Sequence, residues 1–190
     1  NHKYQITKLG KGIRNCHYEG VVEWLQDAGM INVAYLNEPS LPLKGLEDIG
    51  NYRVYYLDHS LLMATLDEES KEYIATTKDF SIYNGAIYES IISQELLIQD
   101  YDLYFYRNSD STCEVDFLVR AKNSLVAIEV KTKKGRMISL KRLLENNQEI
   151  KYGIKLSANN IGVKDNIITM PYFMAFMLRR FLKETTFIDY

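Results

Sequence analysis

The chain has 190 residues, of which 46% are hydrophobic and 25% charged, so it can bury one or two cores without disulfide or metal staples. Because 23 Lys and Arg face 25 Asp and Glu, the net charge of −2 excludes a global electrostatic attraction to nucleic acid or membrane. Any site for a polyanion must be local, and the two distant cysteines, which fit neither a disulfide framework nor a zinc knuckle, favour a cytoplasmic protein.

The N-terminal part of the sequence has the profile of a winged helix. Apolar residues recur at helical spacing in residues 18–30, which predicts a helix. Trp24 is expected to belong to the core of the winged helix. Strands are predicted at 31–36 and 52–57, separated by a proline-containing segment that excludes a helix interior. A helix followed by a two-stranded ribbon is typical of a winged helix, so we assign residues 1–68 to a winged-helix-like segment.

A short helix and a charged segment follow the second strand. The carboxylate of Asp58 can accept from the free amides of a first helical turn, which predicts a helix that runs to Leu66. The charged residues 67–71 are the best candidate for a domain boundary. We therefore expect a second domain over residues 69–190.

The second domain begins with a helix and an antiparallel meander. Apolar residues at helical spacing predict a long amphipathic helix over 82–99. Strands are then predicted at 101–107, 114–120 and 125–131, and the short polar turns between the strands make neighbouring strands antiparallel.

The remainder of the chain completes an α/β pattern. We predict a helix at 138–147, strands at 152–157 and 166–170, and a closing helix at 172–182 that follows Pro171. This order implies a mixed sheet with helices on both faces. The longest apolar run is too short for a bilayer, so no membrane contact is expected, and the missing initial methionine suggests a fragment.

Three residues in two successive strands carry the candidate chemistry. Glu129 and Lys131 are two positions apart, so they share one face of their strand, and a hairpin would bring Asp116 beside Glu129. Two adjacent carboxylates repel unless a cation lies between them, which predicts Mg²⁺ or Mn²⁺ bound by Asp116 and Glu129. Lys131 would stabilise charge on a phosphodiester, and Glu89 is a candidate third carboxylate that orients water.

A basic stretch follows the candidate site. It has no acidic residue before Glu145, and phosphate contacts to DNA are what such a stretch provides. Its candidate nucleic-acid contacts, beyond Lys131, are Lys133, Lys134, Arg136, Lys141 and Arg142.

These residues carry a resemblance to a known group of proteins. Segments 85–89, 104–107, 114–117 and 128–131 resemble the restriction-endonuclease-like, or PD-(D/E)XK, superfamily. They are more closely similar to the uncharacterised C-terminal domain found behind AAA-type P-loop ATPases of bacteria and archaea. Residues 23–30, among other N-terminal segments, resemble the winged-helix linker of the same ATPases.

The resemblance implies a restriction-endonuclease-like mixed sheet flanked by helices, preceded by a small winged-helix segment. It assigns Glu89, Asp116, Glu129 and Lys131 to a nuclease-like hydrolase site. Tyr106 stands where the family usually has Trp. No Gly-x-x-x-x-Gly-Lys-[Ser/Thr] loop occurs in the sequence, so ATP is expected to bind only through an upstream ATPase module outside this chain.

The same residues admit less specific interpretations. A strand that ends in Glu-Val-Lys is more often a solvated ion pair than a catalytic site, and a glutamate on an amphipathic helix usually faces water. One hypothesis is therefore a metal-dependent nuclease or DNA-processing domain. The alternative is a non-catalytic DNA- or protein-binding module attached to a P-loop ATPase, and a defence-associated regulator is a third hypothesis.

Overall fold

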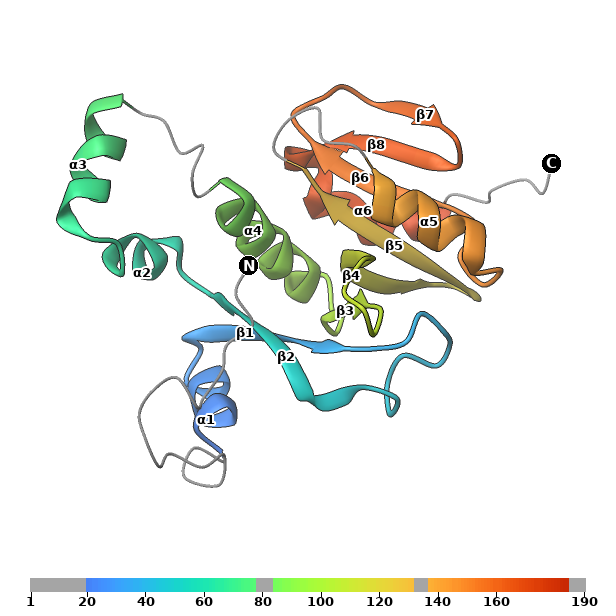
Figure 1. Ribbon diagram of the computed structural model, residues 1–190, viewed down its shortest axis with the longest axis horizontal. Helices are drawn as coiled ribbons and strands as arrows, with labels where there is room; N and C mark the ends of the chain where they lie inside the picture. Colours follow the sequence, from blue (N-terminus) through green and yellow to red (C-terminus); the bar gives the residue numbers. More distant parts are fainter. Residues whose placement is uncertain (1–19, 78–83, 132–136, 185–190) are drawn as a thin grey trace.

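A single mixed sheet organises the molecule (Figure 1), as seen in a computed structural model that describes residues 20–77, 84–131 and 137–184. The strands are β1 (Ile31–Leu36), β2 (Asp48–Tyr56), β3 (Tyr104–Arg107), β4 (Glu114–Ala121), β5 (Ser124–Val130), β6 (Gly153–Ser157), β7 (Gly162–Lys164) and β8 (Ile167–Pro171). Their order across the 8-stranded sheet is β2-β1-β3-β4-β5-β6-β8-β7. The sheet contains both parallel and antiparallel pairs, which confirms the predicted α/β fold.

Every helix of the structure except α3 lies close to a predicted one. They are α1 (Val21–Asp27), α2 (His59–Ala64), α3 (Glu68–Thr77), α4 (Asn84–Ile98), α5 (Ile138–Asn146), the 3-10 helix η3 (Tyr172–Met177) and α6 (Leu178–Glu184). The predicted cap of α2 is confirmed, because Asp58 Oδ1 accepts a hydrogen bond from the amide of Ser60 at 2.7 Å. None of the described helices combines the length and the apolarity needed to cross a membrane.

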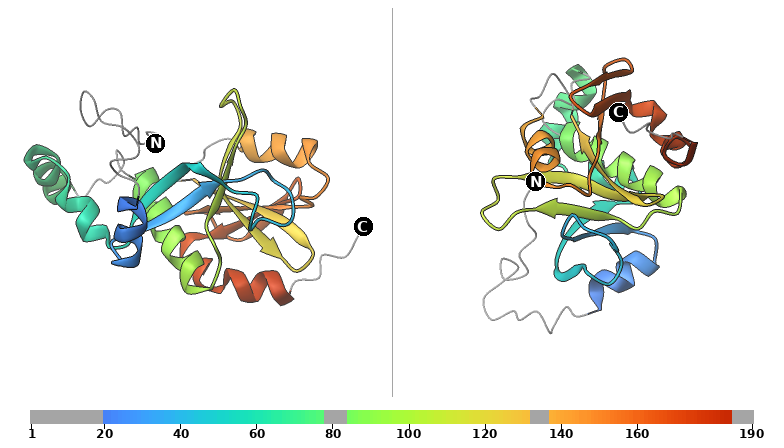
Figure 2. Two further views of the ribbon diagram at one scale, coloured as in Figure 1. Left: turned by 90° about the horizontal axis from the view of Figure 1, so that it is seen from below. Right: turned by 90° about the vertical axis from the view of Figure 1, so that its right-hand side faces the viewer.

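Helices cover both faces of the central strands (Figure 2). One apolar cluster joins β4 and β5 to α4 and α6, through residues such as Phe117, Ile128 and Leu178. The other cluster joins the opposite face to α5 through Leu140 and Leu143. Because both faces are covered, β4 and β5 are buried along almost their whole length.

The predicted antiparallel meander is confirmed. Strand β4 pairs antiparallel with β3 and with β5, and the β4–β5 register places Phe117 opposite Ile128. Helix α5 packs closely on the neighbouring strand β6, because a Cβ at Gly153 would lie only 2.7 Å from Leu140 Cδ1. A glycine is therefore what allows this close approach.

The N-terminal hairpin is an extension of the same sheet. Strands β1 and β2 pair antiparallel, and β1 also pairs parallel with β3, with Tyr35 opposite Tyr104. The sheet thus crosses the predicted boundary between residues 68 and 69. The prediction that Trp24 lies in a core was wrong, since its side chain is 66% exposed and α1 contains no buried residue.

Three local features of the structure were not predicted. Helix α3 begins at Glu68, within the charged segment 67–71, and Asp67 Oδ1 accepts a hydrogen bond from the amide of Ser70 at 2.8 Å. The short strand β7 was not predicted, because three residues carry too little periodicity. The closing helix begins as the 3-10 turn η3 and becomes α-helical at Leu178.

Candidate functional site

The β4–β5 hairpin brings Asp116 and Glu129 together. Phe117 faces Ile128 in the hairpin register, so Asp116 and Glu129 occupy the next pair of positions. Asp116 Oδ2 accepts a hydrogen bond of 2.8 Å from the amide of Val130, which ties the carboxylate to the backbone of β5. The hairpin therefore presents two carboxylates on adjacent strands.

A β-bulge in β4 sets the direction of the Asp116 side chain. Tyr104 pairs with Leu118 and Tyr106 pairs with Val115, so β4 has one residue more than β3 over this stretch. Val115 and Leu118 consequently pack in the same apolar cluster although they are three positions apart. A bulge redirects a side chain in this way without ending the strand.

Both carboxylates are buried, and Lys131 lies at the more exposed side of the pair. Asp116 is 8% exposed and Glu129 is 3% exposed. Lys131 Nζ lies 2.5 Å from Glu129 Oε1, and its side chain is 33% exposed. Within residues 20–77, 84–131 and 137–184, Glu129 Oε2 has no hydrogen-bond partner although it is buried. One carboxylate oxygen of the pair thus retains an unused lone pair.

Glu89 enters the same region from helix α4. Glu89 is only 7% exposed. It therefore does not lie on the solvent-facing side of the helix, where a glutamate of an amphipathic helix usually lies. Burial lowers the pKa of Lys131 and of Arg53, and the charges around them raise it: Glu129 contributes most for Lys131, Tyr55 and Asp116 for Arg53, and Glu89 adds a smaller contribution to both. The four residues predicted for the site, Glu89, Asp116, Glu129 and Lys131, therefore form one electrostatic group.

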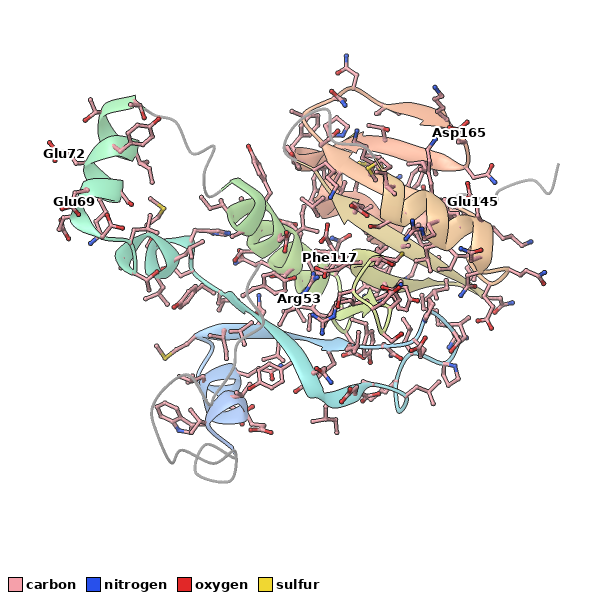
Figure 3. The ribbon with its side chains drawn as sticks, viewed as in Figure 1. Arg53, Glu69, Glu72, Phe117, Glu145 and Asp165 are labelled. Carbon is pink, nitrogen blue, oxygen red and sulfur yellow. The ribbon has the colours of Figure 1, made fainter. Side chains whose placement is uncertain are left out.

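Arg53 of β2 completes the group and was not predicted. Its Nη1 lies 3.6 Å from Asp116 Oδ1, its Nη2 forms an ion pair with Glu114, and its guanidinium carbon is 4.3 Å from the centroid of the Phe105 ring. Figure 3 labels Arg53 in the central part of the molecule. No local sequence signal identifies Arg53, because its role depends on the pairing of β1 with β3.

Burial dominates the ionisation of the acidic pair. Burial, with the neighbouring charge of Asp116, raises the pKa of Glu129 to about 7, and Lys131 opposes this shift. Burial also raises the pKa of Asp116, although the Val130 amide and the Arg53 guanidinium act against it. The cations of the chain therefore compensate only part of the cost of burying these carboxylates.

The other side of Lys131 is held by an aromatic pair. The hydroxyl of Tyr172 donates a hydrogen bond to the Lys131 carbonyl, and the Tyr172 ring stacks on Tyr88 with centroids 4.1 Å apart. Burial raises the pKa of Tyr172 to about 12, so its hydroxyl keeps its proton at neutral pH. Because the Lys131 amide also donates to the Leu156 carbonyl at 2.9 Å, both the amide and the carbonyl of Lys131 are held by hydrogen bonds.

Two of the predicted phosphate contacts lie on the surface of α5. Lys141 and Arg142 are exposed; Lys141 Nζ lies 2.6 Å from Asp165 Oδ2, and Arg142 Nη1 donates to Thr112 Oγ1 at 3.2 Å. The other predicted contacts, Lys133, Lys134 and Arg136, fall outside the described residues. The part of the basic stretch that the structure describes is thus solvent-facing.

The donor atoms of the site are carboxylate oxygens from two strands. Among the described residues, no three His, Cys, Asp or Glu side chains form a group that could hold a metal ion. The site instead offers a pair of carboxylates, with Glu129 Oε2 unused and Asp116 Oδ1 without a short hydrogen bond. Proteins usually contribute one or two carboxylates to a Mg²⁺ site. The pair of Asp116 and Glu129 supplies that number of ligands.

Comparisons with known proteins find partial matches and give the site no function. No curated protein matches the chain significantly. A crystal structure of protein VC1899 from Vibrio cholerae aligns with 95% of this chain at 12% identity and a TM-score of 0.34, and the chain spans 45% of that protein. Residues 84–173, from α4 into η3, match the family model described as a domain of unknown function, DUF4143, and this segment contains Glu89, Asp116, Glu129 and Lys131.

Proposed function

We propose that the chain carries a metal-dependent phosphodiester hydrolase site in a restriction-endonuclease-like domain that processes DNA. The observation that carries the proposal is the buried pair of Asp116 and Glu129 with Lys131 Nζ 2.5 Å from Glu129 Oε1. The two carboxylates on adjacent strands would bind a cation. Lys131, two residues after Glu129, would contact the phosphate beside it.

The donor atoms support Mg²⁺ or Mn²⁺ as the cofactor. Asp116 Oδ1 and Glu129 Oε2 are the oxygens left available after the Val130 amide and Lys131 have taken the other two. Carboxylate oxygen is the ligand these hard cations prefer. Asp116 and Glu129 would hold such an ion, which would supply Lewis acidity for the hydrolysis of a phosphodiester.

Three residues of the chain have separate roles in the proposed hydrolysis. The Val130 amide fixes Asp116, so its free oxygen keeps one position. Lys131, which is part-exposed, presents its ammonium to a phosphodiester and stabilises the negative charge that develops during hydrolysis. Burial lowers the pKa of Lys131, but the hydrogen bond and charge of Glu129 raise it more, and Glu89 adds a smaller contribution in the same direction.

The proposed substrate and partner follow from the surface and from the sequence resemblance. Lys141 and Arg142 on α5 supply exposed positive charge for DNA phosphates. A P-loop ATPase is the proposed partner, because the sequence resembles the region that follows such an ATPase domain. Any use of ATP is assigned to that module.

A nuclease assay tests the proposal. The protein is incubated with single- and double-stranded DNA and RNA, with Mg²⁺, with Mn²⁺ and with a chelator. We expect cleavage that requires the ion and that falls by about 10²–10³-fold in Lys131→Ala. The matched control is Lys71→Ala, because Lys71 also pairs with a glutamate, at 2.7 Å, but lies on α3. Absence of metal-dependent cleavage with every nucleic acid would overturn the proposal.

One observation favours a second function, a non-catalytic DNA- or protein-binding module. Each carboxylate of the pair already has a cation of the chain beside it, Arg53 next to Asp116 and Lys131 next to Glu129. Such pairs also occur as purely structural networks. This function predicts salt-sensitive DNA binding that survives Glu129→Ala and weakens in Lys141→Ala.

A further inference from the structure

Arg53 is held at the candidate site by two contacts that do not involve the acidic pair itself. Its Nη2 pairs with Glu114, and its guanidinium stacks on the Phe105 ring with 4.3 Å between the guanidinium carbon and the ring centroid. The side chain is 14% exposed. A planar cation fixed in this way presents its second amino group in a defined direction.

That second amino group faces Asp116 without satisfying it. Arg53 Nη1 lies 3.6 Å from Asp116 Oδ1, which is longer than a hydrogen bond. Nη1 is also buried, and it has no hydrogen-bond acceptor in the part of the chain that the structure describes. The interaction is therefore a charge pairing that leaves both atoms open to a better partner.

The oxygen that Arg53 faces is the oxygen that a metal ion needs. Asp116 Oδ2 is engaged by the Val130 amide at 2.8 Å, so Oδ1 is the atom left to ligate a cation. A guanidinium and a divalent cation cannot both neutralise one carboxylate oxygen at short range, because their charges repel. Each of them weakens the binding of the other.

We propose that Arg53 is an internal competitor of the divalent cation, so that the β1–β2 hairpin sets the metal affinity of the Asp116–Glu129 pair. The proposal rests on the metal site of the proposed function. Arg53 acts through Asp116 and is a positioning residue. It lies outside residues 84–173, so a segment beyond the matched domain regulates the site.

Glu114 makes the competition reversible. When a cation takes Asp116 Oδ1, the guanidinium keeps its ion pair with Glu114 and its contact with Phe105. Arg53 therefore has a second partner of opposite charge within reach and need not enter solvent. A movement of the β1–β2 hairpin relative to β4 would change the balance between the two states.

The test measures Mn²⁺ affinity of the full chain by electron paramagnetic resonance, with no substrate present. We expect Arg53→Gln to bind Mn²⁺ at least about tenfold more tightly than the natural sequence, because a unit charge next to the ligand is removed. Arg53→Lys keeps the charge and is expected to bind with intermediate affinity. Circular dichroism of each metal-free variant checks that it is folded.

Two further comparisons separate competition at Asp116 from a general effect of charge. Arg107→Gln removes an arginine whose guanidinium carbon is 6.0 Å from the centroid of the same Phe105 ring, and it should leave the affinity within about twofold. Glu114→Gln retains Arg53 but removes its other anchor, so it should weaken Mn²⁺ binding. Adding Arg53→Gln to Glu114→Gln should restore tight binding.

The outcomes distinguish the inference from the proposed function. If the natural sequence binds Mn²⁺ and Arg53→Gln binds equally or less tightly, the inference is wrong and the metal site stands. Unchanged binding in Glu114→Gln contradicts the inference in the same way, even where Arg53→Gln does not fold. If neither the natural sequence nor any folded variant binds Mn²⁺, both the metal site and the competition are wrong.

Discussion

Two antiparallel hairpins of one sheet contribute to the candidate site, and they differ in burial. In the β4–β5 hairpin nearly every residue is buried, whereas β2 of the β1–β2 hairpin is mostly exposed or part-exposed. The first hairpin holds Asp116 and Glu129, and the second holds Arg53. Figure 1 shows the two hairpins in adjoining parts of the molecule.

The difference shows that Asp116 and the arginine that faces it come from hairpins of unequal burial. A carboxylate in a hairpin covered on both faces is held by packing, so its position is set with the core. Arg53 depends on a hairpin at the sheet edge, joined to the rest through the short β1–β3 pairing. Regions with fewer buried contacts open locally at lower free-energy cost, so we expect the β1–β2 hairpin to open before the β4–β5 hairpin.

The largest effect is expected from a core substitution in the buried hairpin. Phe117 is fully buried and its ring centroid is 5.8 Å from that of Tyr55, so Phe117→Ala should lower the free energy of unfolding by about 3–5 kcal/mol. The control Val54→Ala removes a side chain that is 40% exposed on β2 and should cost less than about 1 kcal/mol. Urea unfolding measures both; equal losses would contradict the contrast between the hairpins.

The next effect is a pH dependence that Glu129 confers on the metal-free protein. Folding raises the pKa of Glu129 from 4.5 to about 7, so the folded state keeps a proton that the unfolded state releases. Stability is therefore highest below pH 4.5 with respect to this group and falls by about 2–3 kcal/mol as the pH rises to about 7.

Replacing Glu129 removes this dependence. Glu129→Gln should match the natural sequence near pH 4.5 and be more stable at pH 8, as measured by urea unfolding in a chelator. Glu145→Gln, which alters an exposed glutamate of α5, should follow the natural pH profile. A Glu129→Gln profile that falls as steeply as that of the natural sequence would show that burial of Glu129 is not the cause, because the buried Asp116 accounts for any smaller fall that remains.

A smaller effect is expected at the helix that follows β2. Asp58→Ala removes the acceptor of the Ser60 amide and should lower the free energy of unfolding by about 1 kcal/mol. Asp58→Asn keeps an acceptor at this position and should cost much less. Thermal unfolding compares the two variants. A loss as large as that of Phe117→Ala would mean that this outer region is not less stabilising than the buried hairpin.

The smallest effect is expected at the surface of α5. Lys141 and Asp165 are both about half exposed and 2.6 Å apart, so Lys141→Ala should change the free energy of unfolding by less than about 0.5 kcal/mol. The same variant should weaken DNA binding at low salt if α5 contacts phosphates. A stability loss above about 1 kcal/mol would show that this pair is structural.

The elements that were predicted correctly are those with strong local patterns. The helical spacing of apolar residues located α4, and two short polar turns located the β3–β4–β5 meander. Strand β7 escaped prediction because it is short and its turn depends on the left-handed residues Asp165 and Asn166. The burial of Trp24 was predicted wrongly. A helical pattern indicates which residues share a face, but it does not indicate whether another element covers that face.

The sequence alone determined the α/β order of elements and the neighbouring positions of Asp116, Glu129 and Lys131, because strand alternation and a short hairpin are local geometry. Only the tertiary structure decided which cation faces Asp116. Arg53 reaches Asp116 because β1 pairs with β3, and a pairing between strands so distant in sequence depends on the packing of the whole sheet. The burial that raises the pKa of Glu129 has the same origin, since α5 and α4 must both be in place to exclude water from the hairpin.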